Sequence, residues 1–496
     1  MASSLHRLIA PSPHRSIASS LHRQWSGVSA VDPGSGPDPG PSGLSACTRG
    51  SLVPRIRPMT DRSPARQFAV QFADRRDRVL GELGGRAAMI LPAAPETVVG
   101  RDIELRYVVD PDLWYLTGYE EPEAVAVLAP SADEPFTLFV RDRDPERELW
   151  TGPREEVEEA GERIGADGAY AIAELEERLP SLLKGVDRIH FRVGSGPAHV
   201  ENLVLDILGG GRAARQRSGR GPAELVDPGL ILDPMRIVKE PGEIEAIRNA
   251  VEITVAGFRE ALAAVGPGVG EWVVEAAAEG AFRRAGADGP AFATIAASGP
   301  NATFLHYTAN RRVMEAGELL LLDAGARHRI YNADLTRTVP VSGRYEGPGR
   351  DVYQLVLEAQ RAAIAACRVG IPVDDVHQAA LRIIVAGMVD LGLLDGDPDA
   401  LLGNEAAWKP YFPHNTSHWL GLDVHDVGTY AVDGNPRRLE PGMVLTVEPG
   451  LYIGSDDPDA PEPLRGIGVR IEDDVLITPD GADVLSADLP TAPDAL

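Results

Sequence analysis

The sequence predicts an α+β protein with a small α/β domain over residues 59–232 and a larger domain over residues 233–496. In the first range, short apolar runs alternate with stretches of helical periodicity, which is typical of α/β structure. In the second range, long amphipathic helices alternate with apolar runs that end in acidic residues, which favours a mainly antiparallel sheet with flanking helices. Residues 1–58 carry little apolar sequence to offset the entropy of ordering, so we expect a disordered tail there.

In the first domain, helical spacing covers residues 68–83, 153–164 and 173–184, and apolar runs predict strands at residues 88–91, 124–128 and 136–140. The glycine- and arginine-rich stretch 209–221 indicates a loop. Its run Gly209-x-Gly211-x-x-Ala214 nominally matches a dinucleotide fingerprint. A following helix and an acidic residue to hold the ribose are both missing, so we interpret the stretch as a loop only.

The second domain is predicted to begin with a long helix over residues 241–262. Its start, Pro241-Gly-Glu-Ile-Glu, has proline and acidic residues where a helix N-terminus favours them. Further helices are expected at residues 269–285, 350–368 and 373–394. Strands are expected at residues 318–323 and 443–448, and both end in an acidic residue.

Composition excludes several classes of protein. The net charge of −26 repels phosphate backbones, so no nucleic-acid partner is expected. No apolar run approaches the ~18 residues of a membrane span, so no membrane partner is expected. The two cysteines, Cys47 and Cys367, exclude a disulfide scaffold and a Cys-ligated metal cluster, and they fit a cytoplasmic protein. We expect Cys367 to lie buried in the middle of a helix.

Four acidic residues stand at the ends of apolar runs, where a lone buried charge is costly. Asp323 follows four leucines, and Asp334 lies eleven residues later, so two strands joined by a short turn would set both acids side by side. Glu448 and Glu472 end two further apolar runs. Taken singly, each acid is more often a turn or cap residue, but converging carboxylates require a compensating cation.

Three of the eleven histidines lie within twelve residues, at positions 414, 418 and 425. Oxygen ligands with one imidazole suit Mn, Co, Fe or Zn at a two-metal site. The chain contains no H-E-x-x-H helix, no G-x-S-x-G elbow and no phosphate-binding P-loop motif. The acids and histidines together therefore indicate a metal centre.

In order and spacing, five of these residues resemble the ligands of the pita-bread metallopeptidases, a family that includes methionine aminopeptidase, aminopeptidase P and prolidase: Asp323, Asp334, His418, Glu448 and Glu472. Between about residues 65 and 485, the segments around these ligands and several N-terminal segments are similar to bacterial aminopeptidase P: Asp112-Leu-Trp-Tyr-Leu-Thr-Gly-Tyr-Glu-Glu-Pro-Glu-Ala124, Trp150-Thr-Gly-Pro-Arg154, His306-Tyr-Thr-x-Asn310, Ser417-His-Trp-Leu-Gly-Leu-Asp-Val-His-Asp-Val-Gly428 and Glu448-Pro-Gly-Leu-Tyr-Ile453.

The resemblance implies a pita-bread catalytic domain after an aminopeptidase P N-terminal-like domain, and two divalent metal ions with a water between them. Asp323 is implied to bind one metal, Asp334 and Glu472 to bridge both, and His418 and Glu448 to complete the second. Mn²⁺ is the expected ion, with Co²⁺, Zn²⁺ or Fe²⁺ as alternatives. Glu448 is also the expected proton shuttle.

The resemblance also implies roles around the metals. His425 and His306 are expected to hydrogen-bond the substrate carbonyl and the tetrahedral intermediate. His414, Arg470 and Tyr452 are expected to contact or orient the substrate. A structural role is the alternative for each of them.

The implied activity is release of the N-terminal residue from peptides with proline in second position. The alternatives are a prolidase, which cleaves Xaa-Pro dipeptides from the same site, and a binding protein that has lost catalysis. The second is disfavoured because all five ligand positions are intact. Relatives form dimers or tetramers, and Trp150 resembles a residue that reaches toward a neighbouring subunit.

Overall fold

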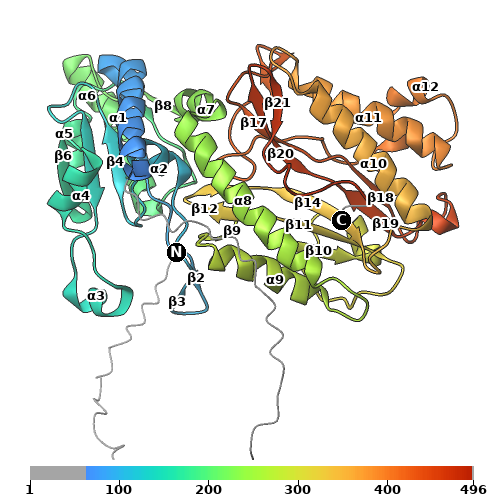
Figure 1. The fold of residues 1–496 in the computed structure, drawn as a ribbon. Helices are drawn as coiled ribbons and strands as arrows, with labels where there is room; N and C mark the ends of the chain where they lie inside the picture. The colour runs from blue at the N-terminus through green and yellow to red at the C-terminus, as the bar shows by residue number, and fades with distance from the viewer. Residues whose placement is uncertain (1–62, 494–496) are drawn as a thin grey trace, which may run out of the picture. The chain divides into compact units, whose positions relative to one another are not determined.

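The computed structural model describes residues 63–493, so the tail expected over residues 1–58 lies outside the described residues. The first part of the described chain is built on a six-stranded mixed sheet in the order β6-β5-β4-β1-β7-β8 (Figure 1). Its strands are β1 (Ala87–Pro92), β4 (Val125–Leu128), β5 (Phe136–Val140), β6 (Gly168–Ala171), β7 (Arg188–His190) and β8 (Glu224–Val226).

Helices cover both faces of this sheet, and the central strand β1 is buried along its whole length. Side chains alternate between the two faces of a strand. Accordingly, Met89 and Leu91 pack in a cluster with residues of α1 (Ser63–Leu83), α2 (Pro111–Thr117) and α4 (Val157–Ile164). Ala88 and Ile90 pack on the other face, with residues of α5 (Leu175–Leu182) and α6 (Ala198–Ser218). The small elements β2 (Val98–Val99), β3 (Ile103–Glu104) and α3 (Pro145–Thr151) lie outside the sheet.

The loop predicted over residues 209–221 is wrong, because α6 continues to Ser218 and ends at Gly219 in a left-handed cap. Three consecutive glycines disfavour a helix on propensity alone. Gly211 instead allows a close approach: a Cβ there would lie 2.0 Å from the carbonyl oxygen of Pro222. The residues that follow, Arg212 to Arg217, are mostly good helix formers, so the helix continues through the glycines.

In the second part of the chain, the predicted long helix is α8 (Pro241–Ala263), and it begins as the sequence indicated. Pro241 occupies the first turn, and the backbone N–H of Glu240 donates to the Glu243 side chain at 2.9 Å in a capping box. The other helices here are α7 (Gly229–Ile237), α9 (Glu271–Arg284), α10 (Gly347–Ala366), α11 (Val373–Asp390), α12 (Pro398–Leu402) and α13 (Glu405–Trp408).

All strand pairings of this second part are antiparallel within the described residues. One sheet has the order β10-β11-β14 and another β17-β20-β21, and a single bridge between Thr336 and Glu472 joins them. The strands are β9 (Gly289–Pro290), β10 (Ile295–Ser298), β11 (Leu319–Ala324), β12 (Ala326–His328), β13 (Tyr331–Asn332), β14 (Leu335–Pro340), β15 (Ala431–Val432), β16 (Asn435–Pro436), β17 (Val444–Val447), β18 (Gly450–Ile453), β19 (Ile467–Arg470), β20 (Asp473–Thr478) and β21 (Gly481–Val484).

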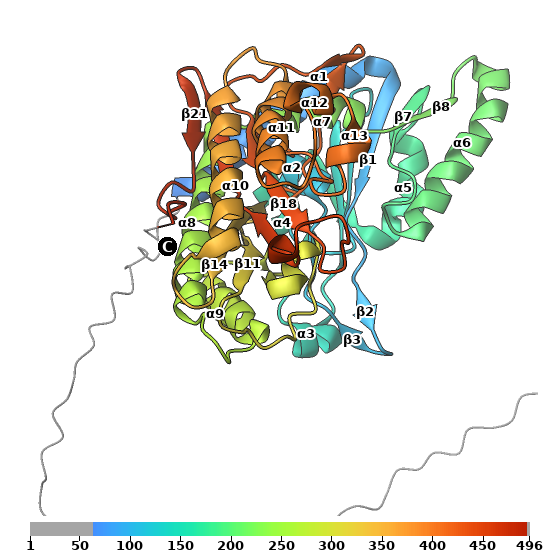
Figure 2. The same cartoon turned by 90° about the vertical axis from the view of Figure 1, so that its right-hand side faces the viewer.

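Two helix pairs flank these strands. Helices α8 and α9 pack together and share a core with β11 and β14, whereas α10 and α11 share a second core with β17, β19 and β20 (Figure 1). Figure 2 shows α10 and α11 side by side from a second direction. An α/β part followed by antiparallel strands between helix pairs is the predicted α+β architecture, which is therefore confirmed.

Two smaller observations complete the fold. Cys367 is buried as predicted, but it follows the last residue of α10 rather than lying in the middle of a helix. Burial raises the pKa of its thiol to about 12, so the thiol is not a nucleophile at neutral pH. Over residues 63–493, no helix combines the length and the apolar character needed to cross a bilayer.

Candidate active site

All of the predicted site residues except Tyr452 line one cavity of about 910 Å³. Asp323 lies in β11, and Asp334 immediately precedes β14, which pairs with β11. Glu448 follows β17, and Glu472 lies between β19 and β20. The short turn expected between the first two acids is instead the hairpin of β12 and β13, but the pairing of β11 with β14 still brings both acids to the cavity.

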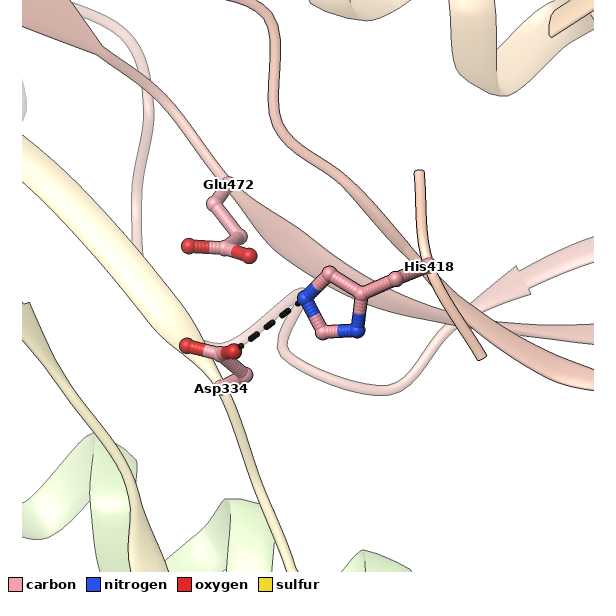
Figure 3. Close-up of side chains that lie close together, drawn as sticks. All are labelled: Asp334, His418 and Glu472. Carbon is pink, nitrogen blue, oxygen red and sulfur yellow. Dashed lines mark ion pairs between the residues drawn. The ribbon is translucent and has the colours of Figure 1, made fainter. Parts of the chain in front are cut away.

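Asp334, His418 and Glu472 form the tightest group, and their potential ligand atoms all lie within 4.8 Å of one another (Figure 3). Nε2 of His418 lies 3.4 Å from Oδ2 of Asp334 and 3.6 Å from Oε1 of Glu448. Nδ1 of His418 lies 3.1 Å from the carbonyl oxygen of Trp419. A proton on Nδ1 donates to that carbonyl and leaves Nε2 as the nitrogen that faces the carboxylates.

Arg470 is the positive side chain that compensates these acids, and it is 4% exposed. Its Nη2 donates to Oδ2 of Asp323, and its Nε donates to Oγ1 of Thr336 at 3.2 Å. Oγ1 of Thr336 in turn donates to Oε2 of Glu472 at 2.7 Å. Arg470 therefore orients one predicted ligand directly and a second through Thr336.

Tyr452 and His414 lie next to Arg470. The hydroxyl of Tyr452 accepts a hydrogen bond from Nη1 of Arg470 at 3.0 Å and lies 2.8 Å from Nε2 of His414. Burial, with Arg470 nearby, lowers the pKa of His414 to about 3, so this imidazole is neutral. Tyr452 is not among the residues that line the cavity, whereas His414 is.

His425 and His306 reach the same cavity from two different loops. The ring centroid of His425 lies 4.4 Å from that of His418, and burial together with His418 lowers the His425 pKa. His306 lies between the 3₁₀ turn Gly299–Thr303 and β11 and is exposed. Within residues 63–493 its side chain forms no hydrogen bond to the other site residues.

The cluster holds more negative charge than its own cations balance. Burial and the neighbouring carboxylates raise the pKa of Asp323 and of Glu448 to about 7, although Arg470 opposes this in both. The same causes raise the pKa of Glu472 well above its usual range. Burial disfavours a charge on His418, but Asp334 and Glu448 raise its pKa to about 9. Further positive charge would stabilise the ionised carboxylates.

The residues present fit a pair of divalent cations. Four carboxylates and one imidazole are the donor types that Mn, Fe, Co and Zn accept. Oδ1 of Asp323 is buried and lacks a hydrogen-bond partner in the described part of the chain, as expected for an oxygen that binds a metal. Asp323, Asp334, His418, Glu448 and Glu472 are therefore the residues that would hold the metals.

Sequence reasoning missed two residues that support this cluster. Thr336 joins Arg470 to Glu472, as described above, and it lies two residues after Asp334 on the same side of the chain. Asp474 is fully buried, and its Oδ2 accepts the backbone N–H of Asp334 at 3.1 Å. The available signal was the acidic run at residues 472–474, which stands directly before the apolar residues 475–477 of β20 (Asp473–Thr478).

Two family models match the chain. The model of the aminopeptidase P N-terminal domain matches residues 72–190, and the model of metallopeptidase family M24 matches residues 245–479. The four predicted acidic ligands and His418 all lie within the second range.

Individual proteins give the same result. An Xaa-Pro aminopeptidase of Escherichia coli is 40% identical over 86% of this chain and 96% of that protein. Human Xaa-Pro aminopeptidase 3 is 34% identical over 85% of this chain and 84% of that protein. The solved structure of Pseudomonas aeruginosa aminopeptidase PepP superposes with a TM-score of 0.82 at 40% identity and covers 86% of this chain and 96% of that one. A zinc-substituted Escherichia coli aminopeptidase P in complex with product gives 0.81 at 40% identity, over 86% and 97% of the two chains. With these matches along both parts of the chain, this protein belongs to metallopeptidase family M24, as a member of its aminopeptidase P group.

Proposed function

We propose that this protein is an Xaa-Pro aminopeptidase that works with two divalent metal ions, Mn²⁺ in the native enzyme. The observation that carries the proposal is the convergence of Asp323, Asp334, His418, Glu448 and Glu472 in one cavity. The similarity to proteins named Xaa-Pro aminopeptidase supports the substrate class. The metals, when bound, would lower the pKa of a water molecule and stabilise negative charge on the tetrahedral intermediate.

In this proposal Asp334 and Glu472 would help to hold both metals. Both are buried and lie with His418 in the tightest group of potential ligand atoms. Asp323 would hold one metal, for which its Oδ1, without a hydrogen-bond partner in the described part of the chain, is available. His418 and Glu448, whose side chains are 3.6 Å apart, would hold the second metal.

Glu448 also moves the proton. Its Oε1 faces His418 and its Oε2 lies 3.7 Å from His414, so the carboxylate reaches the cavity between two imidazoles. It takes a proton from the attacking water and delivers it to the proline nitrogen as the peptide bond breaks. The neutral His425 and the exposed His306 donate hydrogen bonds to the substrate carbonyl oxygen as it gains negative charge. His414, Tyr452 and Arg470 contact or orient the substrate at the wall beside Glu448.

The proposal can be tested by removing the metal from the protein with a chelator and then adding metal ions back. Chelation should abolish hydrolysis of an Xaa-Pro-Yaa peptide, and Mn²⁺, Co²⁺ and Zn²⁺ should then be compared in restoring it. Far-ultraviolet circular dichroism should change little, because a chain of this size buries a large core without metal. Activity that persists after complete chelation, verified by metal analysis, contradicts the proposal.

We also propose that the chain divides at residues 59–232 and 233–496, acts in the cytoplasm and forms a homo-oligomer, either a dimer or a tetramer. The exposed α3 side chains Leu149 and Trp150, 86% and 88% accessible in one chain, support the oligomer because large apolar side chains are rarely so exposed. Light scattering on the purified protein measures the oligomeric state, and a monomer at micromolar concentration contradicts it.

A further inference from the structure

Glu271 is a buried carboxylate with an unusual number of hydrogen-bond donors. It is the first residue of α9 and is fully buried. Its Oε1 accepts from the backbone N–H of Ser298 at 2.8 Å, from Oγ of Ser298 at 2.7 Å and from Nδ2 of Asn301 at 3.1 Å. Its Oε2 accepts from the hydroxyl of Tyr307 at 3.0 Å and from the backbone N–H of Arg312 at 2.8 Å.

These donors lie at the two ends and in the middle of one segment, residues 298–312. The backbone completes the attachment, because the N–H of Glu271 donates to the carbonyl oxygen of Arg312 at 2.9 Å. Residues 304–312 of the segment form no helix or strand, and Phe304, His306 and Thr308 are exposed. Leu305 and Tyr307 pack partly on a small apolar cluster, and the buried Asn310 side chain is hydrogen-bonded to the backbone of Ala296 and Thr294. Glu271 bonds to both ends and to the middle of the segment, so it is one main restraint on the conformation of this part.

His306 lies in the middle of this segment and lines the active-site cavity. The residue next to it, Tyr307, is one of the donors to Glu271. We infer that Glu271 is a positioning residue for the reaction: it holds segment 298–312 so that His306 stays over the cavity. This inference rests on the proposed function, in which His306 hydrogen-bonds the substrate carbonyl.

Glu271 acts at a distance from the metal ligands. Ser298 pairs with Leu320 in the β10–β11 ladder, whereas Asp323 lies three residues further along β11 and pairs with Ile295. Removing the carboxylate should therefore displace His306 without changing the ligand cluster. A displacement of about 1 Å at a group that contacts the reacting atoms is enough to cost roughly a hundredfold in rate.

The test is a double-mutant cycle with an Xaa-Pro-Yaa substrate and the Mn²⁺ enzyme. Glu271→Gln keeps the shape of the side chain but replaces one acceptor oxygen with a donor, so it should lower kcat roughly tenfold to a hundredfold. Mn²⁺ stoichiometry should stay unchanged. In the His306→Ala background the same substitution should change kcat less than twofold, because the group that Glu271 positions is gone.

Glu243→Gln is the matched control. Glu243 is likewise a buried glutamate in the first turn of a long helix, but its partners are Tyr331, Arg75 and the Glu240 backbone. The Glu243→Gln substitution should change kcat by the same factor in the wild-type and in the His306→Ala background. If Glu271→Gln does not fold, Tyr307→Phe removes a single donor to Glu271 and should show the same dependence on His306 with a smaller loss.

Equal loss of kcat on Glu271→Gln in both backgrounds overturns the inference while leaving the proposed function intact. Unchanged kcat in His306→Ala also overturns it, since nothing would then need positioning. Failure of the wild-type enzyme to cleave any Xaa-Pro-Yaa peptide, in contrast, contradicts the proposed function itself.

Discussion

At the scale of single residues, the site is a problem of uncompensated charge. Three buried carboxylates and the half-buried Glu448 face one another, and the cations beside them are the buried Arg470 and, when protonated, the half-buried His418. Replacing one of these carboxylates with a neutral side chain would relieve the repulsion between them. The cluster is therefore not explained by folding stability, and it indicates a functional site. The expected consequence is that conservative substitutions harm catalysis far more than folding.

Glu448→Gln tests this most directly. The amide keeps the size of the side chain and one oxygen ligand, but it cannot accept the proton from water. We expect kcat to fall by roughly 10²–10⁴-fold, the usual contribution of general acid–base catalysis, with unfolding temperature unchanged or raised. Metal content by mass spectrometry is the control, because loss of metal would explain the same result differently. Full activity of Glu448→Gln with bound metal would contradict the assignment of Glu448 as the proton shuttle.

Sequence patterns predicted the four acids and the histidine that meet in the cavity, but not the residues that hold them in place. Asp323, Glu448 and Glu472 could be found because a charge at the end of an apolar run is visible locally. Asp474 and Thr336 could not, because their roles depend on hydrogen bonds to residues that are 140 and 136 positions away along the chain. Those contacts exist only after the two sheets meet at the Thr336–Glu472 bridge.

At the scale of elements, α6 is the helix that local sequence propensities did not predict. Glycine costs helix stability, so three in a row predict a break, yet one of the three has a packing reason that the sequence does not reveal. The four long helices of the second part and the two strands that the sequence predicts there lie close to their predicted bounds, because their apolar periodicity is long and is reinforced by caps such as the capping box of α8. The short strands and helices of this part were not predicted.

The neighbouring glycines of α6 give a matched pair of variants. Gly210→Ala meets nothing within 4 Å and should raise the free energy of unfolding by about 0.5–1 kcal/mol. Gly211→Ala places a Cβ against the carbonyl of Pro222 and should lower it by about 1–3 kcal/mol. Urea titration of both variants measures the difference. Stabilisation by both substitutions would mean that the helix does not approach Pro222 closely.

Helix α11 supports the loop of the active-site histidines through His377, and this contact should depend on pH. Nδ1 of His377 lies 2.9 Å from Oγ1 of Thr416, and its ring packs on Phe412. Burial lowers the pKa of His377 below 6.5, and Lys409 adds to this, whereas Asp374 and Glu405 oppose it. As the pH falls through 6.5, the unfolded chain binds a proton that the folded chain does not, so the free energy of unfolding decreases.

His377→Gln should remove this dependence. Between pH 7.5 and 5.5, the wild type should lose about 1 kcal/mol more of its free energy of unfolding than the variant. His199→Gln, at an exposed histidine, is the control and should behave as the wild type. An identical loss in wild type and His377→Gln would show that this imidazole is not a source of acid sensitivity.

At the scale of the whole molecule, the first part of the chain is tied to the loop that carries His425. Arg236 is buried and pairs with Asp112 of α2 at 2.7 Å and with Asp426 at 2.6 Å, directly after His425. Arg75 of α1 pairs with Glu240 and Glu243 at the start of α8. Substitutions at these contacts in the first part of the chain should therefore affect the geometry of the catalytic cavity, although the first part contributes no predicted metal ligand.

The composition of the whole cavity also bears on whether the protein is an aminopeptidase P or a prolidase. These enzymes share the ligand set but differ in how they bind the part of the substrate that follows the proline. A prolidase must bind the terminal carboxylate of an Xaa-Pro dipeptide. Among the described residues that line the cavity, Arg470 is the one arginine or lysine, and it is already engaged by Asp323, Thr336 and Tyr452. A dipeptide carboxylate would thus enter a cavity rich in acids without a free cation, whereas a longer peptide carries its carboxylate away.

We therefore expect Ala-Pro-Ala to be hydrolysed faster than Ala-Pro, with free alanine and intact Pro-Ala as products. Ala-Pro-amide separates charge from length, because it has the size of the dipeptide without its carboxylate. Its turnover should approach that of the tripeptide if the unpaired charge is what slows Ala-Pro. Ala-Ala-Ala is the control for the second position and should be a poor substrate. Faster cleavage of Ala-Pro than of its amide would indicate a carboxylate-binding group in the cavity and would identify the protein as a prolidase. A preference for Ala-Ala-Ala would contradict the assignment of proline specificity.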